Sequence, residues 1–244
     1  QSSMRDSGLD STVVAWDDDV SWPNYDCLIL RSPWDYASRF EEFSRWLKDI
    51  SKHTRVVNSP ELVRWNLDKR YLFDLADRGV RIVPSTLCPD LTTCGDAIAA
   101  HVSQVVVKPT VSNSSQLTGL FSTDDPRALG LCEEIFSLGK QVLVQPAIDA
   151  IQDDAERCLL FFGGKLSHTV QKCAILEAGG GYRGGHYRTI TRPAVATSDE
   201  LALAEQTLSA IGQIAEERGW SVDAQLPLYL RVDLVTPHDG QPML

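Results

Sequence analysis

LYLRVDLV, residues 228–235, alternates apolar and polar side chains from Leu228 to Leu234. A period of two predicts a β-strand with Arg231 and Asp233 side by side on one face and apolar residues on the other. A cation beside a carboxylate on such a strand suits a site that binds a polyphosphate and its magnesium ion. An exposed face held by a salt bridge would have the same pattern, so the strand alone leaves both interpretations open.

A second apolar run, Val105–Val107, ends in Lys108 and leads into a loop of small hydroxyl and amide residues that includes Ser114 and Ser115. Such a loop can point backbone N–H groups and hydroxyls at phosphate oxygens, and the lysine adds a compact positive charge. A strand that ends in an ordinary polar turn is equally compatible with these residues taken alone.

A third run, Val142–Val144, continues into Gln145, Pro146, Ala147 and Ile148. Extended backbone can imitate base pairing, so the Pro146 carbonyl could accept from the exocyclic amine of adenine while the Ile148 N–H donates to a ring nitrogen. A strand that simply ends at a proline explains the segment just as well by itself.

Two further segments are candidates for contacts with a substrate. The loop that contains Arg31, Trp34, Asp35 and Tyr36 follows the apolar run 27–30, and ligands bind beyond strand ends in open α/β sheets. Its aromatic residues can wall a small polar molecule while Arg31 holds a carboxylate. A structural turn around a buried tryptophan is the alternative.

The second segment is a predicted β-hairpin, because Gly163-Gly164 is a suitable two-residue turn between the apolar runs 158–162 and 166–170. His168 and Lys172 lie four residues apart on its second strand and therefore share a face. That face either touches substrate or phosphate, or is plainly exposed.

A glycine-rich segment, residues 179–184 (GGGYRG), formally matches a dinucleotide-binding pattern. The residues after it are rich in β-formers and close at Pro193, so no helix follows to receive a pyrophosphate. We interpret the segment as a glycine loop that could place Arg183 or Arg188 over a site.

The remaining periodicities predict α/β structure first and two mixed α+β units after it. The predicted helices cover residues 38–50, 60–79, 126–139 and 197–219, and the other predicted strands cover 12–16, 27–30 and 80–83. Ser59-Pro60 and the Thr197-x-x-Glu200 capping box mark two of the helix starts.

Composition excludes several classes of function for these 244 residues. The formal net charge of -10 argues against nucleic-acid binding, which needs clustered Lys and Arg. No stretch approaches the ~20 apolar residues of a membrane span, and no signal-peptide pattern opens the chain. The six cysteines form no C-x-x-C pair, which favours reduced thiols in a cytoplasmic protein.

These features, in this order, resemble the ATP-grasp superfamily over most of the chain from Asn58 onward. The resemblance implies an α/β fold followed by α+β: a pre-ATP-grasp α/β domain at 1–58, an N-terminal lobe with a linker helix at 59–148, and a C-terminal lobe at 149–244. The two-lobed ATP-grasp fold grips ATP between antiparallel sheets.

The resemblance also implies roles for residues at the matching positions. Lys69, near the start of the first helix, and Lys108 contact the polyphosphate, and the segment from Gln145 to Ile148 binds adenine. Glu156 is the candidate for the ribose, with Asp153 and Asp154 as close competitors.

At the C-terminal end, the resemblance places Arg231 at the transferring phosphate and Asp233 on magnesium. Lys172, from the hairpin face described above, is the other candidate catalytic residue. The family continues with a Glu and an Asn that complete the metal site, whereas this sequence stops at Leu244. Together with the tag-like residues before Met4, this predicts that segments are missing at both ends, including an opening strand and helix between Met4 and Arg5.

The loops at 31–36 and 161–168 are similar to those of glutathione-synthetase-like ligases, and especially of the cyclo-ligases that form cycloserine from O-ureido-serine. A member of this group uses ATP and Mg²⁺ to phosphorylate a carboxylate of a small amino-acid-like substrate, and an amine then displaces phosphate. A small-molecule kinase or a non-catalytic ATP-binding module on the same fold are the alternatives, and a homodimer is possible.

Overall fold

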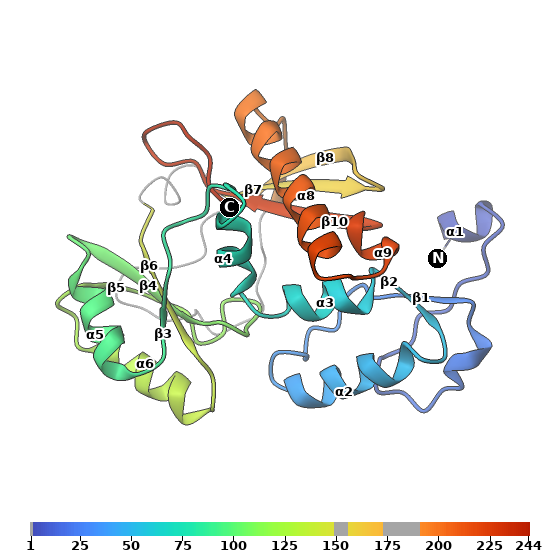
Figure 1. Cartoon of the computed structure of the whole chain (residues 1–244), viewed down its shortest axis with the longest axis horizontal. Helices are drawn as coiled ribbons and strands as arrows, with labels where there is room; N and C mark the ends of the chain where they lie inside the picture. Colours follow the sequence, from blue (N-terminus) through green and yellow to red (C-terminus); the bar gives the residue numbers. More distant parts are fainter. Residues whose placement is uncertain (1, 149–155, 173–190) are drawn as a thin grey trace.

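The computed structural model describes residues 2–148, 156–172 and 191–244, arranged around three sheets (Figure 1). In the N-terminal part, strands β1 (Cys27–Ile29) and β2 (Arg55–Val57) pair in parallel. Helix α2 (Phe40–Ile50) packs its buried Phe43, Leu47 and Ile50 into the core of this unit. The helices α1 (Ser2–Asp6) and η1 (Trp22–Asn24) precede β1. Met4 and Arg5 both lie within α1, where the sequence predicted a break in the chain.

The predicted strand at residues 12–16 is wrong. The carboxylate of Asp18 accepts the Ala15 N–H at 2.8 Å, which occupies a donor that a neighbouring strand would need. Trp16 instead buries its ring edge-on against Phe43, at a centroid distance of 5.3 Å. The segment is therefore held by its side chains rather than by a sheet.

The linker is two short helices, α3 (Pro60–Asn66) and α4 (Tyr71–Ala76), where one helix was predicted. Ser59 caps α3 as expected, with its hydroxyl accepting from the Leu62 N–H. The break falls at Lys69, whose backbone N–H leaves the helix to donate to the Thr110 carbonyl at 2.9 Å. The interruption thus ties the linker to the loop after β4.

The second sheet has the antiparallel order β3-β6-β4-β5, and two helices cover one of its faces. Its elements are β3 (Thr86–Cys88), α5 (Leu91–Ala99), β4 (Gln104–Pro109), β5 (Gly119–Ser122), α6 (Arg127–Ser137) and β6 (Val142–Pro146). The strand predicted at residues 80–83 is wrong, because the backbone of Arg81 and Val83 bonds instead to Leu244 at the other end of the chain. The strand that enters the sheet begins at Thr86.

The third sheet has the antiparallel order β10-β7-β8-β9. Its elements are β7 (Glu156–Phe162), β8 (Lys165–Lys172), β9 (Thr191–Ala194), α8 (Ser198–Glu217), α9 (Val222–Gln225) and β10 (Tyr229–Leu234). The predicted hairpin turn at Gly163 and Gly164 is confirmed, and both glycines have positive φ. The capping box of α8 is confirmed as well, and this helix buries its apolar face on the sheet.

Candidate active site

A cavity of about 820 Å³ lies between the second and third sheets and the N-terminal unit. The residues predicted as site residues that line it are Arg31, Trp34, Tyr36, Lys69, Lys108, Ser114, Ser115, Gln145, Pro146, Ala147, Ile148, Glu156, Arg231 and Asp233. Residues far apart in the sequence therefore meet in one place, and the predicted clustering of Lys108 with Arg231 and Asp233 is confirmed.

Lys108 reaches the cavity through strand alternation on β4. Val105 and Val107 are fully buried toward α5 and α6, so Val106 and Lys108 face the other way and line the cavity. Among the described residues the Lys108 ammonium has no hydrogen-bond acceptor or ion-pair partner. Burial lowers its pKa to about 8, although nearby Glu156 opposes this shift. An uncompensated, poorly hydrated cation of this kind calls for an anionic ligand.

Lys69 is hydrogen-bonded to the loop at residues 109–115, hereafter the 109–115 loop. Its ammonium donates to the Ser112 hydroxyl at 2.8 Å and to the carbonyls of Pro109, Thr110 and Ser112 at 3.2–3.3 Å. Burial, and then the charge of Lys108, lower the Lys69 pKa to about 7. Lys69 thus shapes the loop from inside while also lining the cavity.

The 109–115 loop and the residues after it have an unusual backbone. Ser114, Ser115 and Leu117 all have φ between 49° and 55°. Left-handed backbone costs roughly 1–2 kcal/mol for each non-glycine residue, so the surrounding contacts must impose this shape. Successive N–H groups in such a turn can form a concave anion-binding surface.

A network of four charged residues lies on the third sheet. Arg231 binds both oxygens of Asp233, with Nε–Oδ1 at 2.6 Å and Nη2–Oδ2 at 2.7 Å. Lys172 donates to Glu156 Oε1 at 2.7 Å and to Asp233 Oδ2 at 3.1 Å. Strand pairing makes the network possible, because Asp233 lies opposite Cys158 on β7 and Lys172 lies opposite Glu156.

The network shifts the pKa values of its members. Burial works against the charged form of Asp233, but Arg231 outweighs it and lowers the Asp233 pKa to about 2. Burial and the charge of Asp233 raise the pKa of Glu156. The pKa of Lys172 is raised by Asp233 and Glu156 against the effect of its own burial. The surroundings thus favour the charged forms of Asp233 and Lys172 and disfavour the charged form of Glu156.

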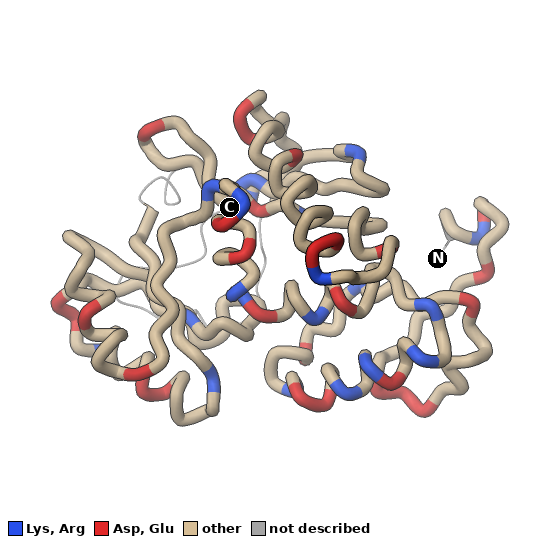
Figure 2. The backbone as a smooth tube through the Cα atoms, in the orientation of Figure 1, with Lys and Arg blue, Asp and Glu red and all other residues tan. Residues whose placement is uncertain are grey.

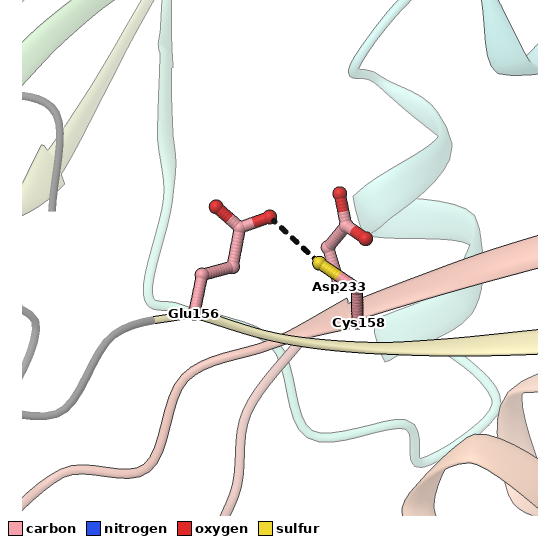
Figure 3. A group of neighbouring side chains, drawn as sticks. All are labelled: Glu156, Cys158 and Asp233. Carbon is pink, nitrogen blue, oxygen red and sulfur yellow. Dashed lines mark hydrogen bonds between the residues drawn. The ribbon is translucent and has the colours of Figure 1, made fainter. Parts of the chain in front are cut away.

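Oxygen donors that suit a magnesium ion are present in this network. The ligand atoms of Glu156, Cys158 and Asp233 lie within 4.8 Å of one another (Figure 3). Carboxylates fit the preference of Mg²⁺ for hard oxygen ligands, whereas a thiol suits softer metals. Asp233 and Glu156 therefore fit magnesium, and the Cys158 thiol does not.

The loop at residues 31–37, hereafter the 31–37 loop, forms another wall of the cavity and is bonded to the 109–115 loop. Tyr36 donates through its hydroxyl to the Ser112 carbonyl at 3.4 Å, and the Asn113 amide donates to the Trp34 carbonyl. Arg31 lines the cavity and has no ion-pair partner among the described residues. Its guanidinium is thus available to a carboxylate.

Three residues that the sequence predicted as site residues, Asp35, His168 and Lys172, are not among those that line the cavity. Asp35 accepts from the Trp16 indole N–H at 2.8 Å and from Arg39 at 2.9 Å, so its carboxylate organises the N-terminal unit. His168, four residues before Lys172 on β8, is exposed, and its ring nitrogen lies within hydrogen-bond distance of the neighbouring Ser167 hydroxyl. Arg183, Arg188, Asp153, Asp154 and the 179–184 glycine loop lie outside the described residues.

Sequence reasoning missed several residues of the site. Asn58 lines the cavity and holds β10, because its side chain accepts from the Leu228 N–H and donates to the Tyr229 carbonyl, both at 2.8 Å. Lys140 donates to the carbonyls of Ala37 and Val111. No local sequence pattern around Asn58 or Lys140 indicates these contacts. Cys158, in contrast, lies two residues after Glu156 on β7, so strand alternation could have placed both side chains on the same face.

Comparisons with known proteins agree with this architecture. A family model described as the N-terminal domain of D-cycloserine synthetase DcsG matches residues 1–58. The cycloserine biosynthesis protein DcsG of Streptomyces lavendulae is 32% identical, with 99% of this chain and 81% of that protein covered. The crystal structure of D-cycloserine synthetase DcsG superposes with a TM-score of 0.89 at 32% identity, over 99% of this chain and 82% of that one.

A more distant solved structure shows the same fold. It is the ATP-grasp ligase PsnB in complex with a minimal precursor, Mg and ADP, at 14% identity and a TM-score of 0.54. The match covers 89% of this chain and 66% of that one. The likeness confirms the predicted ATP-grasp fold. Among the described residues, no helix is both long and apolar enough to cross a membrane.

Proposed function

Because this chain belongs to the D-cycloserine synthetase family of ATP-grasp ligases, which form C–N bonds, we propose that it activates a substrate carboxylate as an acyl phosphate. The substrate is a small amino-acid-like molecule that carries the attacking amine in the same molecule. ATP is the phosphoryl donor, and ADP and phosphate are the co-products. The observation that carries the proposal is the meeting of Lys108, Arg231 and Asp233 in one cavity.

The nucleotide fits the cavity with its adenine against the end of β6. The Ala147 N–H is already bonded to the Gln104 carbonyl at 2.9 Å. This leaves the Pro146 carbonyl and the Ile148 N–H as the groups for the adenine edge. Glu156, which also lines the cavity, is the candidate for the ribose as well as for the metal.

The phosphates then extend toward the cations. Lys108 offers an unpaired ammonium to them, and the 109–115 loop offers N–H groups and the hydroxyls of Ser114 and Ser115. Arg231 presents a planar fork that can bind two oxygens of the transferring phosphoryl group. Magnesium, when bound by Asp233 and Glu156, neutralises charge on the phosphates.

The substrate carboxylate attacks the γ-phosphorus, and the bond from that phosphorus to the ADP oxygen breaks. The substrate nitrogen then attacks the acyl carbon, the C–O bond to phosphate breaks, and one proton leaves the nitrogen. Arg31 orients the substrate, with Trp34 and Tyr36 as walls. The protein contributes mainly positioning and electrostatics, as in other phosphoryl transfers.

The test is ADP release by the full chain with ATP, Mg²⁺ and O-ureido-serine, together with mass analysis of the product. A cyclic product formed with one ADP per turnover is the expected result. A stable phosphorylated product would identify a kinase instead, and ATP binding without substrate-dependent ADP release would identify a binding module.

The variants Asp233→Asn and Arg231→Lys should both lower turnover far more than stability. Lys165→Ala, outside the cavity, is the control.

A further inference from the structure

The Lys172 ammonium lies at the position that a metal ion would need. It is 2.7 Å from Glu156 Oε1 and 3.1 Å from Asp233 Oδ2, the two carboxylates that fit magnesium. The Cys158 thiol donates to the same Glu156 oxygen at 3.7 Å (Figure 3). An ion held by these groups would therefore overlap the lysine.

The local charges are already balanced without a metal. The formal charges of Glu156 and Asp233 are matched by those of Lys172 and Arg231, with which they pair. The Lys172 side chain is only 14% exposed, so solvent screens its repulsion of another cation poorly. Along the rest of the described backbone, Lys and Arg are interspersed with Asp and Glu (Figure 2).

We propose that Lys172 occupies the divalent-cation site of the nucleotide-free protein, so that the metal enters only together with the phosphates of the nucleotide. Mg²⁺ gives up its water reluctantly, and two carboxylates that are already paired offer it little in exchange. A polyphosphate changes the balance, because it supplies both oxygen ligands for the metal and a new partner for the lysine. Lys172 is thus a positioning residue that sets the order of binding.

This inference deepens the proposed function, but its central measurement needs no nucleotide and no turnover. The probe is Mn²⁺, titrated into the nucleotide-free full chain, with the free ion followed by electron paramagnetic resonance. Wild-type protein should bind Mn²⁺ weakly. Lys172→Met should bind one ion at least about tenfold more tightly, because a neighbouring unit charge has been removed.

Lys172→Arg is the conservative control and should bind the metal as weakly as wild type, because it keeps the charge. Equal Mn²⁺ affinity of wild type and Lys172→Met would overturn the proposal. If Lys172→Met does not fold, the Mn²⁺ affinity of the wild-type protein with and without ADP still tests the proposal. One Mn²⁺ bound as tightly without ADP as with ADP would overturn the proposal, and a clear gain on adding ADP would support it.

Cys158 supplies a second readout of the same site. Cd²⁺ prefers thiolate ligands and gives an ultraviolet charge-transfer band when bound to sulfur. Lys172→Met should show this band, and the double variant with Cys158→Ser should lose it. Cys27→Ser, which changes an exposed thiol elsewhere, should leave the band of Lys172→Met unchanged. An equal band in wild type would contradict the role of Lys172.

A failure of these metal titrations would leave the ligase proposal intact, since that proposal rests on substrate-dependent ADP release. Conversely, a protein that makes no cyclic product could still show the predicted difference between wild type and Lys172→Met. The two proposals can therefore fail separately.

Discussion

At the scale of single residues, Lys108 is a cation in the cavity wall that has no ion-pair partner among the described residues. Lys108→Ala should weaken ATP binding by roughly 1.5–3 kcal/mol, the loss expected for a charge-assisted contact. The free energy of unfolding should stay the same or rise slightly, because the substitution removes an ammonium group that is poorly solvated in the folded protein. Calorimetric titration with ATP and thermal unfolding measure the two effects, with Lys165→Ala on the exposed hairpin as the matched control.

The lowered pKa of Lys108, about 8, also predicts how ATP affinity depends on pH. Phosphate binds the protonated lysine, so affinity should decline as the pH rises through about 8, with proton uptake on binding above that pH. Stability should change in the opposite direction: unfolded lysine has a pKa of about 10.4, so between about 8 and 10.4 the unfolded state binds more protons and stability rises with pH. Lys108→Arg should remove the step near pH 8, and a step of unchanged size would contradict its assignment to Lys108.

Residue-scale prediction succeeded where the information was local. Strand alternation was enough to place Arg231 with Asp233 on one face of β10. It did not anticipate the hydrogen bond from the Trp16 indole to Asp35, because these two residues are 19 positions apart and meet only in the folded N-terminal unit. The ionic partners of Lys172 likewise come from two other strands, which no local pattern could reveal.

At the scale of elements, the capping box of α8 offers a test that is independent of function. Thr197 accepts from the Glu200 N–H at 3.2 Å, and the Glu200 side chain accepts from the Thr197 N–H at 2.8 Å. Thr197→Ala should cost about 1 kcal/mol of stability, measured by urea unfolding. Neither residue lines the cavity, so ATP affinity should not change. Ser198→Ala, one residue along, should have little effect.

Elements with their own start and stop signals were predicted well, as α8 and the β7–β8 hairpin show. The errors fell on segments whose backbone partners are distant. Residues 81–83 bond to Leu244, and the linker helix breaks because the Lys69 N–H bonds to Thr110. Local sequence propensity carries no information about either of these long-range contacts.

At the scale of the whole molecule, the cavity draws its lining from the second and third sheets and from loop residues of the N-terminal unit, so a bound nucleotide should stabilise the entire fold. A ligand at 100 times its Kd adds about 2.7 kcal/mol. For a chain of this size, that corresponds to a rise in Tm of roughly 5–10 °C. Differential scanning calorimetry with ADP and Mg²⁺ checks this, and Lys108→Ala at the same concentrations should show a much smaller rise. A Tm that does not respond to nucleotide would argue against the cavity as its site.

The hydrogen bonds that join the 31–37 loop to the 109–115 loop have a consequence for cooperativity. Tyr36, Asn113 and Lys140 connect the wall for the substrate with the cradle for the phosphates. A ligand that orders one loop thereby reduces the entropy that remains to be lost when the other is ordered. We expect positive heterotropic coupling, and it must be reciprocal, so the factor by which substrate tightens ATP equals the factor by which ATP tightens substrate.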